Sequence, residues 1–554
     1  MKRFKFLFFP SILIFLVCIS YVNSLNNGFV SDDIPGIVQT GASWTWHMVT
    51  TDIRFLTRWT SMLQFFMYQF VGLSPWGYRL INIVFHVLAV LLVQAIVTRL
   101  SNKRIGFLTG ALFAVHPIIV ESVTWISGGV YAQYVTVFLL SFWLFLKQKD
   151  VGRRKNVWYV SSIVFYGISL FFSEKAAVLF LLFFVYTWSF ETGKKQWMKL
   201  IPYVFLSSIF IFFYSTHLGS RIAEVAVTSG GGVGTLYNPL QQIPLAISTY
   251  LKLIVWPSDL TLYHDERLNP VGYVFRLAVF ALYCFGLIYT AWKKRNIFFW
   301  LSWFLIPLLP TLTPFRIAWV VAERYAYMSV IGIFVCIAYW FDWMLTYSFP
   351  EALRSQKKFY VSSVAGVFSP FRSSRLASEA TKIFSASRAL LRIFQFSVLL
   401  GIILIYLAFI TRTIIRNRDW TSEDTLWIAT AQISPTVPYT WNNMGDVYSR
   451  HGDLEKAAES FQRAIRLNPK YADAHHNLGQ TYRTMGEVGD AILMYEKALV
   501  YNPNLWQSHA SLAAIYYAKK DYQMALNHIE QALKIVPSAQ MLITARDQIK
   551  TLLP

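Results

Sequence analysis

Long apolar segments are the feature that most limits what this chain of 554 residues can fold into. A helix of roughly 20 apolar residues spans the hydrocarbon core of a bilayer, where backbone polar groups must be satisfied within the segment itself. Such segments recur along most of the sequence before residue 412. We predict about eleven crossings, at residues 6–22, 79–98, 105–124, 131–146, 157–173, 176–190, 200–215, 271–291, 297–313, 325–345 and 395–411.

Basic clusters between these segments indicate on which side of the membrane each loop lies, because Lys and Arg are enriched in cytoplasmic loops. The clusters occupy residues 2–5, 99–104, 147–155, 194–199, 293–295 and 354–392. If all six are cytoplasmic, the N-terminus is cytoplasmic too, and residues 23–78 and everything after about residue 412 lie outside. The apolar segment 240–257 then cannot be a crossing. We expect it to form an interfacial or re-entrant helix, since it contains Gln241, Gln242, Pro244 and Lys252.

The composition agrees with a multi-pass membrane protein: 55% of the residues are hydrophobic and only 14% are charged. A net charge of +21 could indicate nucleic-acid binding, but the basic residues fall in short clusters between apolar segments. We therefore expect membrane lipids rather than nucleic acid as partners.

A period of 34 residues marks the C-terminal region. Pro435, Pro469, Pro503 and Pro537 are spaced by this interval, and small and aromatic residues recur in register between them. This is the period of the tetratricopeptide repeat, a helical hairpin that stacks on its neighbours. The sequence predicts an all-α protein, a helix bundle in the membrane followed by an α-solenoid.

The predicted organisation has six parts. They are a transmembrane module at 1–345 with an outer loop at 23–78, a basic cytoplasmic loop at 346–394, the last span at 395–411, a connector at 412–437, three repeats at 438–539 and a capping helix or tail at 540–554.

Candidate catalytic residues stand in the first outer loop, where Asp32 and Asp33 are adjacent and Arg54 follows. A doubled Asp before Ile-Pro-Gly can also be a helix N-cap beside a solvated carboxylate. Further candidates are His116, Glu121, Lys175 and Arg324, which lie within or at the ends of apolar segments. Ionisable groups at membrane depth are functional or form buried pairs, and a histidine there can simply hydrogen-bond between helices.

Equivalent positions of the three repeats carry Asn443, Asn477 and Ser511. Side-chain amides in a row could bind the backbone of an acceptor peptide; the alternative is a solvated or inter-repeat polar position. No His-x-x-x-His spacing occurs in the outer loops and the three cysteines lie in apolar runs, so the sequence supports no divalent metal site.

These residues suit transfer of a group onto an acceptor hydroxyl at the outer surface. A carboxylate would take the hydroxyl proton, and Lys175 or Arg324 would bind the anionic leaving group. A lipid-linked phosphosugar suits the setting as donor and co-substrate, because nucleotide sugars are not available on that side.

Several strings resemble a known family: "NNGFVSDDIPGI", "RFLTRWT", "GYRLINIVFH", "ALFAVHPIIVESVTWISG", "SEKAAV", "AERYAYMSVIG" and "RNRDWTSEDTLW". They are similar to the transmembrane and tetratricopeptide-repeat O-mannosyltransferases, of the GT-C class of membrane glycosyltransferases. The resemblance implies inverting transfer of mannose or another hexose from a polyprenyl-phosphate sugar, with Asp32 or Asp33 as base and the repeats presenting a protein acceptor.

Two other interpretations remain open. A non-catalytic scaffold would use the repeats to recruit envelope proteins, and a sugar-lipid flippase would need internal repeats of the spans, which the sequence lacks. The chain contains no Asn-x-Ser/Thr sequon. This favours a bacterial inner membrane with periplasmic repeats over an endoplasmic reticulum membrane with luminal repeats.

Overall fold

The computed structural model describes residues 2–51, 59–150, 154–228, 238–264, 270–312, 319–346 and 370–553, and within these it contains helices and turns but no β-strand. The all-α prediction is confirmed. The helices before the long helix α18 are α1 (Lys2–Tyr21), α2 (Trp46–Thr51), α4 (Trp59–Val71), α5 (Pro75–Leu100), α6 (Lys103–Val115), α7 (Val120–Val123), α8 (Val130–Lys147), α9 (Lys155–Phe172), α10 (Phe180–Phe190), α11 (Lys194–Met198), α12 (Ile201–Thr228), α13 (Pro239–Val255), α14 (Pro270–Lys293), α15 (Arg295–Leu305) and α16 (Ala326–Thr346).

Seven described helical segments are long and apolar enough to cross a membrane: Phe8–Asn26, Pro75–Leu100, Ser127–Lys147, Lys194–Phe213, Val271–Lys293, Glu323–Thr346 and Leu391–Asp419. An eighth crossing would be the pair Lys103–Val115 and Pro117–Val123, which is bent by 55° at His116. The chain is therefore a multi-pass membrane protein.

The number of crossings differs from the eleven predicted, although all eleven segments fall on helices. Segments 176–190 and 297–313 coincide with α10 and α15, which have 11 residues each and are preceded or followed by a 3₁₀ turn. Eleven residues of helix extend about 16 Å, roughly half the hydrocarbon core. Segment 157–173 coincides with α9, whose 18 residues begin with Lys155 and Asn156. α9 is not among the described segments that are long and apolar enough to cross a membrane.

The segment expected to be interfacial or re-entrant forms α13. It packs against α14, and residues from Pro244 to Tyr250 are buried. The Tyr250 hydroxyl accepts from the Ala322 amide and donates to its carbonyl oxygen, each at 3.1 Å. α13 is thus fastened beside the start of α16.

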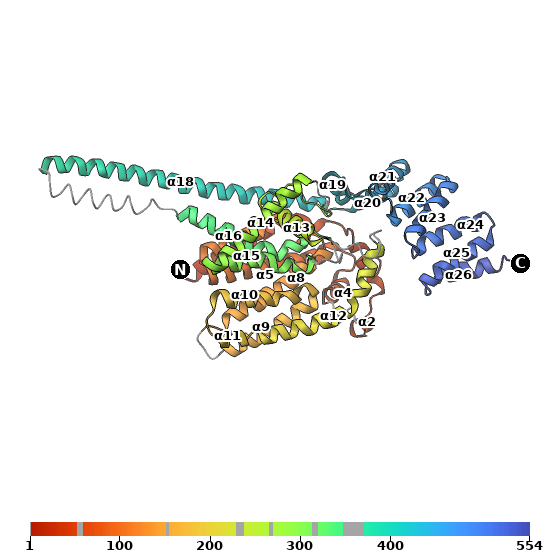
Figure 1. Ribbon diagram of the computed structural model, residues 1–554, viewed down its shortest axis with the longest axis horizontal. Coiled ribbons are helices and arrows are strands. Elements are labelled where there is room, and N and C mark those ends of the chain that lie inside the picture. The colour runs from red at the N-terminus through yellow and green to blue at the C-terminus, as the bar shows by residue number, and fades with distance from the viewer. Residues whose placement is uncertain are drawn as a thin grey trace.

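α18 (Pro370–Asp419) is a single helix of 50 residues. The predicted last span lies inside it, and the part of the predicted basic loop at 370–394 is its first half rather than a loop; residues 347–369 lie outside the described residues. Figure 1 shows α18 projecting beyond one end of the bundle and reaching the repeats at the other.

The C-terminal region is a stack of helical hairpins: α19 (Glu423–Ile433), α20 (Pro438–Arg450), α21 (Leu454–Leu467), α22 (Ala472–Met485), α23 (Val488–Tyr501), α24 (Trp506–Ala518), α25 (Tyr522–Ile535) and α26 (Gln540–Lys550). Small residues allow close contact within each hairpin. A Cβ added at Gly445 of α20 would meet the Phe461 ring of α21 at 2.5 Å.

Candidate active site

The loop with the doubled aspartate follows α1 and reverses direction at Ser31. Ser31 has φ 54°, in the left-handed region that residues other than glycine rarely adopt. The Ser31 amide donates to Glu423 Oε1 at 2.6 Å, which fixes the turn against the start of α19. As a result the two carboxylates separate: Asp33 is buried and Asp32 is exposed.

The Asp33 side chain is buried and holds the loop in place through hydrogen bonds. Its Oδ1 accepts from the Ser127 amide at 2.8 Å and the Ser127 hydroxyl at 2.5 Å, and its Oδ2 accepts from the Val30 amide at 3.3 Å. Burial raises the pKa of Asp33 to about 6, against the lowering effects of these bonds and of the Arg79 charge. Asp33 precedes a short helical turn but makes no side-chain cap there, so the N-cap interpretation does not describe it.

Arg79 of α5 ties this loop to the bundle. The guanidinium is fully buried and donates from Nε to the Thr124 carbonyl at 2.9 Å, and from its two terminal nitrogens to the carbonyls of Asn27 and Gly28. The loop position is therefore set by a charge that interacts chiefly with backbone oxygens.

Asn417, near the end of α18, joins the loop from the other side. Its amide donates to the Ser20 carbonyl and to Asn23 Oδ1, each at 2.8 Å, and its Oδ1 accepts from the Thr124 hydroxyl at 2.7 Å. The Gly28 amide donates to the Thr421 carbonyl at 2.8 Å. This explains why the "RNRDWTSEDTLW" connector and the "NNGFVSDD" loop belong together in space.

Asp32 has no hydrogen bond or ion pair through its side chain with any residue that the structure describes. Loss of surrounding water raises its pKa, and the Arg324 charge lowers it. The exposed carboxylate is thus free and lies within the field of a guanidinium.

Arg324 is held by Glu121, which is fully buried in α7. Glu121 Oε2 accepts from the Arg324 amide at 2.8 Å, and Oε1 pairs with Nη1 of the guanidinium. The guanidinium lies over the rings of Trp125, at 5.4 Å, and Tyr325, at 5.0 Å. Among the described residues its Nε and Nη2 have no partner, so two donors remain available.

Lys175 lies beside Tyr325, the tyrosine that Arg324 also contacts. Its Nζ donates to the Tyr131 hydroxyl at 2.6 Å and lies 4.8 Å from the Tyr131 ring centre and 5.2 Å from that of Tyr325. Lys175 and Arg324 therefore share the Tyr325 ring, and the site combines one free carboxylate with two neighbouring cations.

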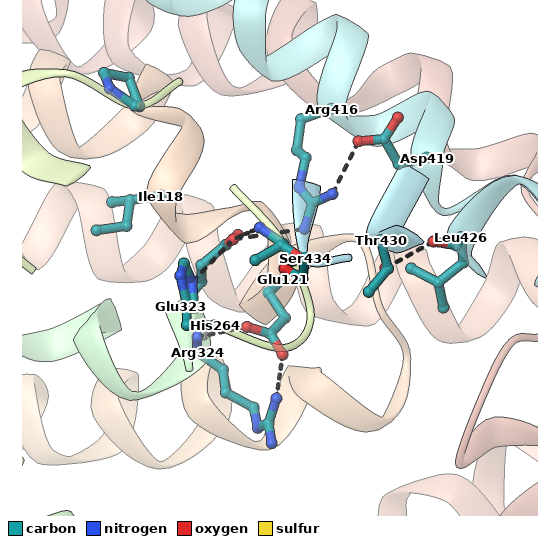
Figure 2. A network of polar contacts seen from close by, with 12 residues as sticks. Ile118, Glu121, His264, Glu323, Arg324, Arg416, Asp419, Leu426, Thr430 and Ser434 are labelled. Atoms are coloured by element: carbon teal, nitrogen blue, oxygen red, sulfur yellow. Dashed lines mark hydrogen bonds and ion pairs between the residues drawn. The ribbon is translucent and has the colours of Figure 1, made fainter. Parts of the chain in front are cut away.

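A second buried network of polar contacts, centred on Glu323, adjoins the site (Figure 2). Glu323 is fully buried; its Oε1 lies 3.5 Å from Arg416 Nη2 and 3.7 Å from His264 Nε2 and accepts from the Thr261 amide. Arg416 Nη1 pairs with Asp419 at 2.8 Å. The network ties α18 and the loop after α13 to the residue next to Arg324.

The remaining candidates are His116 and Arg54. His116 is buried at the bend between α6 and α7; its Nε2 bonds the Ile254 carbonyl at 2.9 Å and its Nδ1 accepts from the Ile118 amide at 3.3 Å. Both ring nitrogens are occupied, as expected of a helix-packing histidine. Arg54 lies outside the described residues.

The predicted polar row in the repeats consists of half-buried side chains. Asn477 donates to Asn442 Oδ1 at 3.1 Å and to Asp446 Oδ1 at 3.4 Å in the preceding repeat. The Asn443 side chain lies close to that of Tyr263, and the Ser511 side chain lies close to that of Tyr495. Each residue therefore has a neighbour within the protein, and Asn477 lies between repeats.

Sequence reasoning missed several residues around the site. Arg416, His264 and Tyr263 were not candidates, because Arg416 lies beyond the predicted last span and the other two lie in a loop that has no motif of its own. Within the described ranges, no group of three or more His, Cys, Asp or Glu side chains could hold a metal ion.

Comparison with family models gives two kinds of match. The model described as dolichyl-phosphate-mannose-protein mannosyltransferase matches residues 44–219, and tetratricopeptide-repeat models match residues 445–486 and 472–505. Among curated proteins, protein O-mannosyl-transferase TMTC3 of Mus musculus is 23% identical over 523 residues, covering 84% of this chain and 52% of its own length. Protein O-mannosyl-transferase TMTC1 of Homo sapiens is 31% identical over 156 residues, covering 24% of this chain and 17% of its own length.

The chain is similar to the protein O-mannosyl-transferases TMTC3 and TMTC1. It spans about half the length of TMTC3, the relative with which it aligns over most of its own length. The family resemblance seen in the motifs is thus confirmed, because apolar module and repeats match together.

Solved structures give weaker likenesses. ArnT from Cupriavidus metallidurans bound to undecaprenyl phosphate has 12% sequence identity and a TM-score of 0.40, with 79% of this chain and 81% of that chain covered. The apo form of ArnT gives 13% identity and a TM-score of 0.42 over the same shares.

Proposed function

We propose that this protein is a membrane glycosyltransferase that moves mannose or another hexose from a polyprenyl-phosphate donor to a hydroxyl of a protein Ser or Thr. The observation that carries the proposal is the exposed, unpaired Asp32 within the field of Arg324, with Lys175 against the same Tyr325 ring as Arg324. The names of the matching family model and of the curated relatives support mannose as the sugar and protein as the acceptor.

Asp32 is the base in this proposal. It accepts the proton of the acceptor hydroxyl while the hydroxyl oxygen forms a bond to the anomeric carbon of the sugar. The bond from that carbon to the phosphate oxygen breaks, and the electron pair leaves with the polyprenyl phosphate. Single displacement inverts the anomeric configuration. Desolvation raises the pKa of Asp32, which improves a carboxylate as a base.

Arg324 and Lys175 bind the phosphate. Glu121 pairs with one guanidinium nitrogen of Arg324 and fixes the guanidinium plane. The other two nitrogens of the guanidinium stay available for phosphate oxygens. The negative charge that develops on the leaving oxygen is stabilised by both cations. No metal ion takes part in the proposal.

Asp33 positions the loop rather than reacting. Both of its oxygens already accept hydrogen bonds, and its side chain is buried. The proposed orientation places the N-terminus in the cytoplasm and the active site and repeats outside, in the periplasm if the membrane is bacterial and in the lumen if it belongs to the endoplasmic reticulum.

Envelope glycan profiling with and without this gene tests the activity and reports sugar and acceptor together. Loss of a hexose from specific Ser or Thr residues supports the proposal. An unchanged glycan profile with altered recruitment of envelope proteins would instead indicate a non-catalytic scaffold.

A further inference from the structure

Three tyrosines form a row between the loop after α13 and the first repeats. Tyr263 lies in that loop, Tyr439 in α20 and Tyr471 at the start of α22. The ring centres of Tyr263 and Tyr439 are 5.9 Å apart, and those of Tyr439 and Tyr471 are 5.0 Å apart. The row therefore continues from the membrane module onto the repeats.

Only 5% of the Tyr471 surface is exposed, yet its hydroxyl makes no hydrogen bond with any residue that the structure describes. The charges of Asp473 and Asp446 both act on this hydroxyl, as do Tyr439 and Tyr263. A nearly buried tyrosine whose hydroxyl has no described partner, beside two carboxylates and two rings, indicates a place for a ligand.

Asp446 and Asp473 lack a cation. Neither carboxylate forms an ion pair with a described residue. Arg450, whose charge acts on Asp446, is itself paired with Asp424 at 3.2 Å and Glu423 at 3.7 Å. Asp446 has only a weak bond from Asn477 at 3.4 Å. Burial raises the pKa of Asp446 to about 7, with Arg450 lowering it and Glu423 and Asp473 raising it.

The row also reaches the proposed catalytic base. The Asp32 charge acts on Tyr263, and the Tyr263 side chain lies close to Asn443 of α20. A chain lying along the tyrosines would thus pass from Asp446 and Asp473 to Asp32.

We propose that Tyr263, Tyr439, Tyr471, Asp446 and Asp473 form a subsite for a Lys or Arg side chain of the acceptor segment. This inference rests on the proposed function and names its substrate class: a Ser or Thr that has a basic residue nearby in sequence. Tyrosine faces attract cations, and desolvated carboxylates without a counterion gain most from one.

The ring separations limit the length of the row. Together they correspond to at most about three residues of extended chain between Tyr263 and Tyr471, at 3.3–3.6 Å per residue. A short peptide can therefore reach along the whole row.

Binding of short peptides to the full-length protein in lipid nanodiscs tests this subsite. The probe is a fluorescent Ser/Thr peptide with one Lys, scanned over successive positions, and the matched peptide has Gln in its place. We expect the Lys peptide at its best position to bind at least about tenfold more tightly. The difference should vanish in the D446N/D473N double variant and persist in D490N, which removes an exposed carboxylate of α23.

Three results overturn the subsite: equal binding of Lys and Gln peptides at every position, a Lys preference that survives in D446N/D473N, or an equal loss in D490N. The peptide substitutions leave the protein unchanged, so they test the proposal even if the double variant fails to fold. Because binding needs no transfer, an inactive protein that still prefers Lys would refute the proposed function and keep the subsite.

Discussion

Ser127 holds Asp33 by two hydrogen bonds to one carboxylate oxygen, from its amide at 2.8 Å and from its hydroxyl at 2.5 Å. The doubled aspartate thereby divides its roles: Asp33 anchors the loop to the turn before α8, and Asp32 remains free. The division follows from the turn at Ser31, whose amide is fixed by Glu423.

Replacing Asp33 by Ala should lower stability more than the same change at Asp32. The half-buried Ser127 amide and hydroxyl would lose their acceptor, at a cost of about 1–3 kcal/mol in the free energy of unfolding. Thermal unfolding in detergent, followed by tryptophan fluorescence, measures this. Equal melting temperatures for the two alanine variants would contradict the anchoring role.

Arg324→Lys should reduce transfer by at least about tenfold and raise KM for the lipid-phosphate donor. Lysine keeps the charge, but all its donors are on one nitrogen, so it cannot pair with Glu121 and also bind a phosphate through two separate nitrogens as a guanidinium does. The matched control is Arg412→Lys, since Arg412 contacts only the Pro257 and Ser258 carbonyls among the described residues. An unchanged donor KM in Arg324→Lys would remove Arg324 from phosphate binding.

Arg416→Met should destabilise the protein by about 3–5 kcal/mol, because Glu323 would keep its buried charge and lose its nearest cation. Adding Glu323→Gln should recover most of this loss. Chemical denaturation of the single and double variants checks the coupling, and Arg450→Met, at an exposed pair, should have little effect. Additive losses in the double variant would show that the two residues act separately.

Binding of the Lys peptide should weaken as the pH falls through about 7. The pKa of Asp446 is raised to about 7, so its carboxylate is charged above this pH and becomes neutral below it. Between pH 8 and pH 6 the affinity should fall by up to about tenfold, and D446N should flatten this dependence. Fluorescence anisotropy at fixed ionic strength measures it; a pH profile identical in D446N would assign the titration to another group.

Much of the fold could be predicted from local sequence. The apolar segments and the 34-residue period place helices and repeats because each depends on neighbours in sequence. The crossings at 176–190 and 297–313 could not be judged in this way, since 3₁₀ turns shorten α10 and α15.

The site was predicted only in part, because its contacts join distant segments. The motif strings indicated Asp32, Glu121, Lys175 and Arg324, but the roles of Asp32 and Asp33 depend on Ser127 and Glu423, far along the chain. Arg416 opens the "RNRDWTSEDTLW" string, but the string did not indicate its role, and Tyr263 lies in none of the quoted strings. Only the packing of the loop after α13 against α18 and α20 brings the two residues to the site.

Transfer from a polyprenyl-phosphate mannose to an acceptor peptide by the purified protein tests the central claim most directly. Asp32→Asn keeps the size of the side chain and removes the base, so its transfer rate should fall by at least about a hundredfold, while its melting temperature stays near that of the wild type. Asp33→Asn should retain more activity per folded molecule than Asp32→Asn. Undiminished transfer by Asp32→Asn would contradict the account.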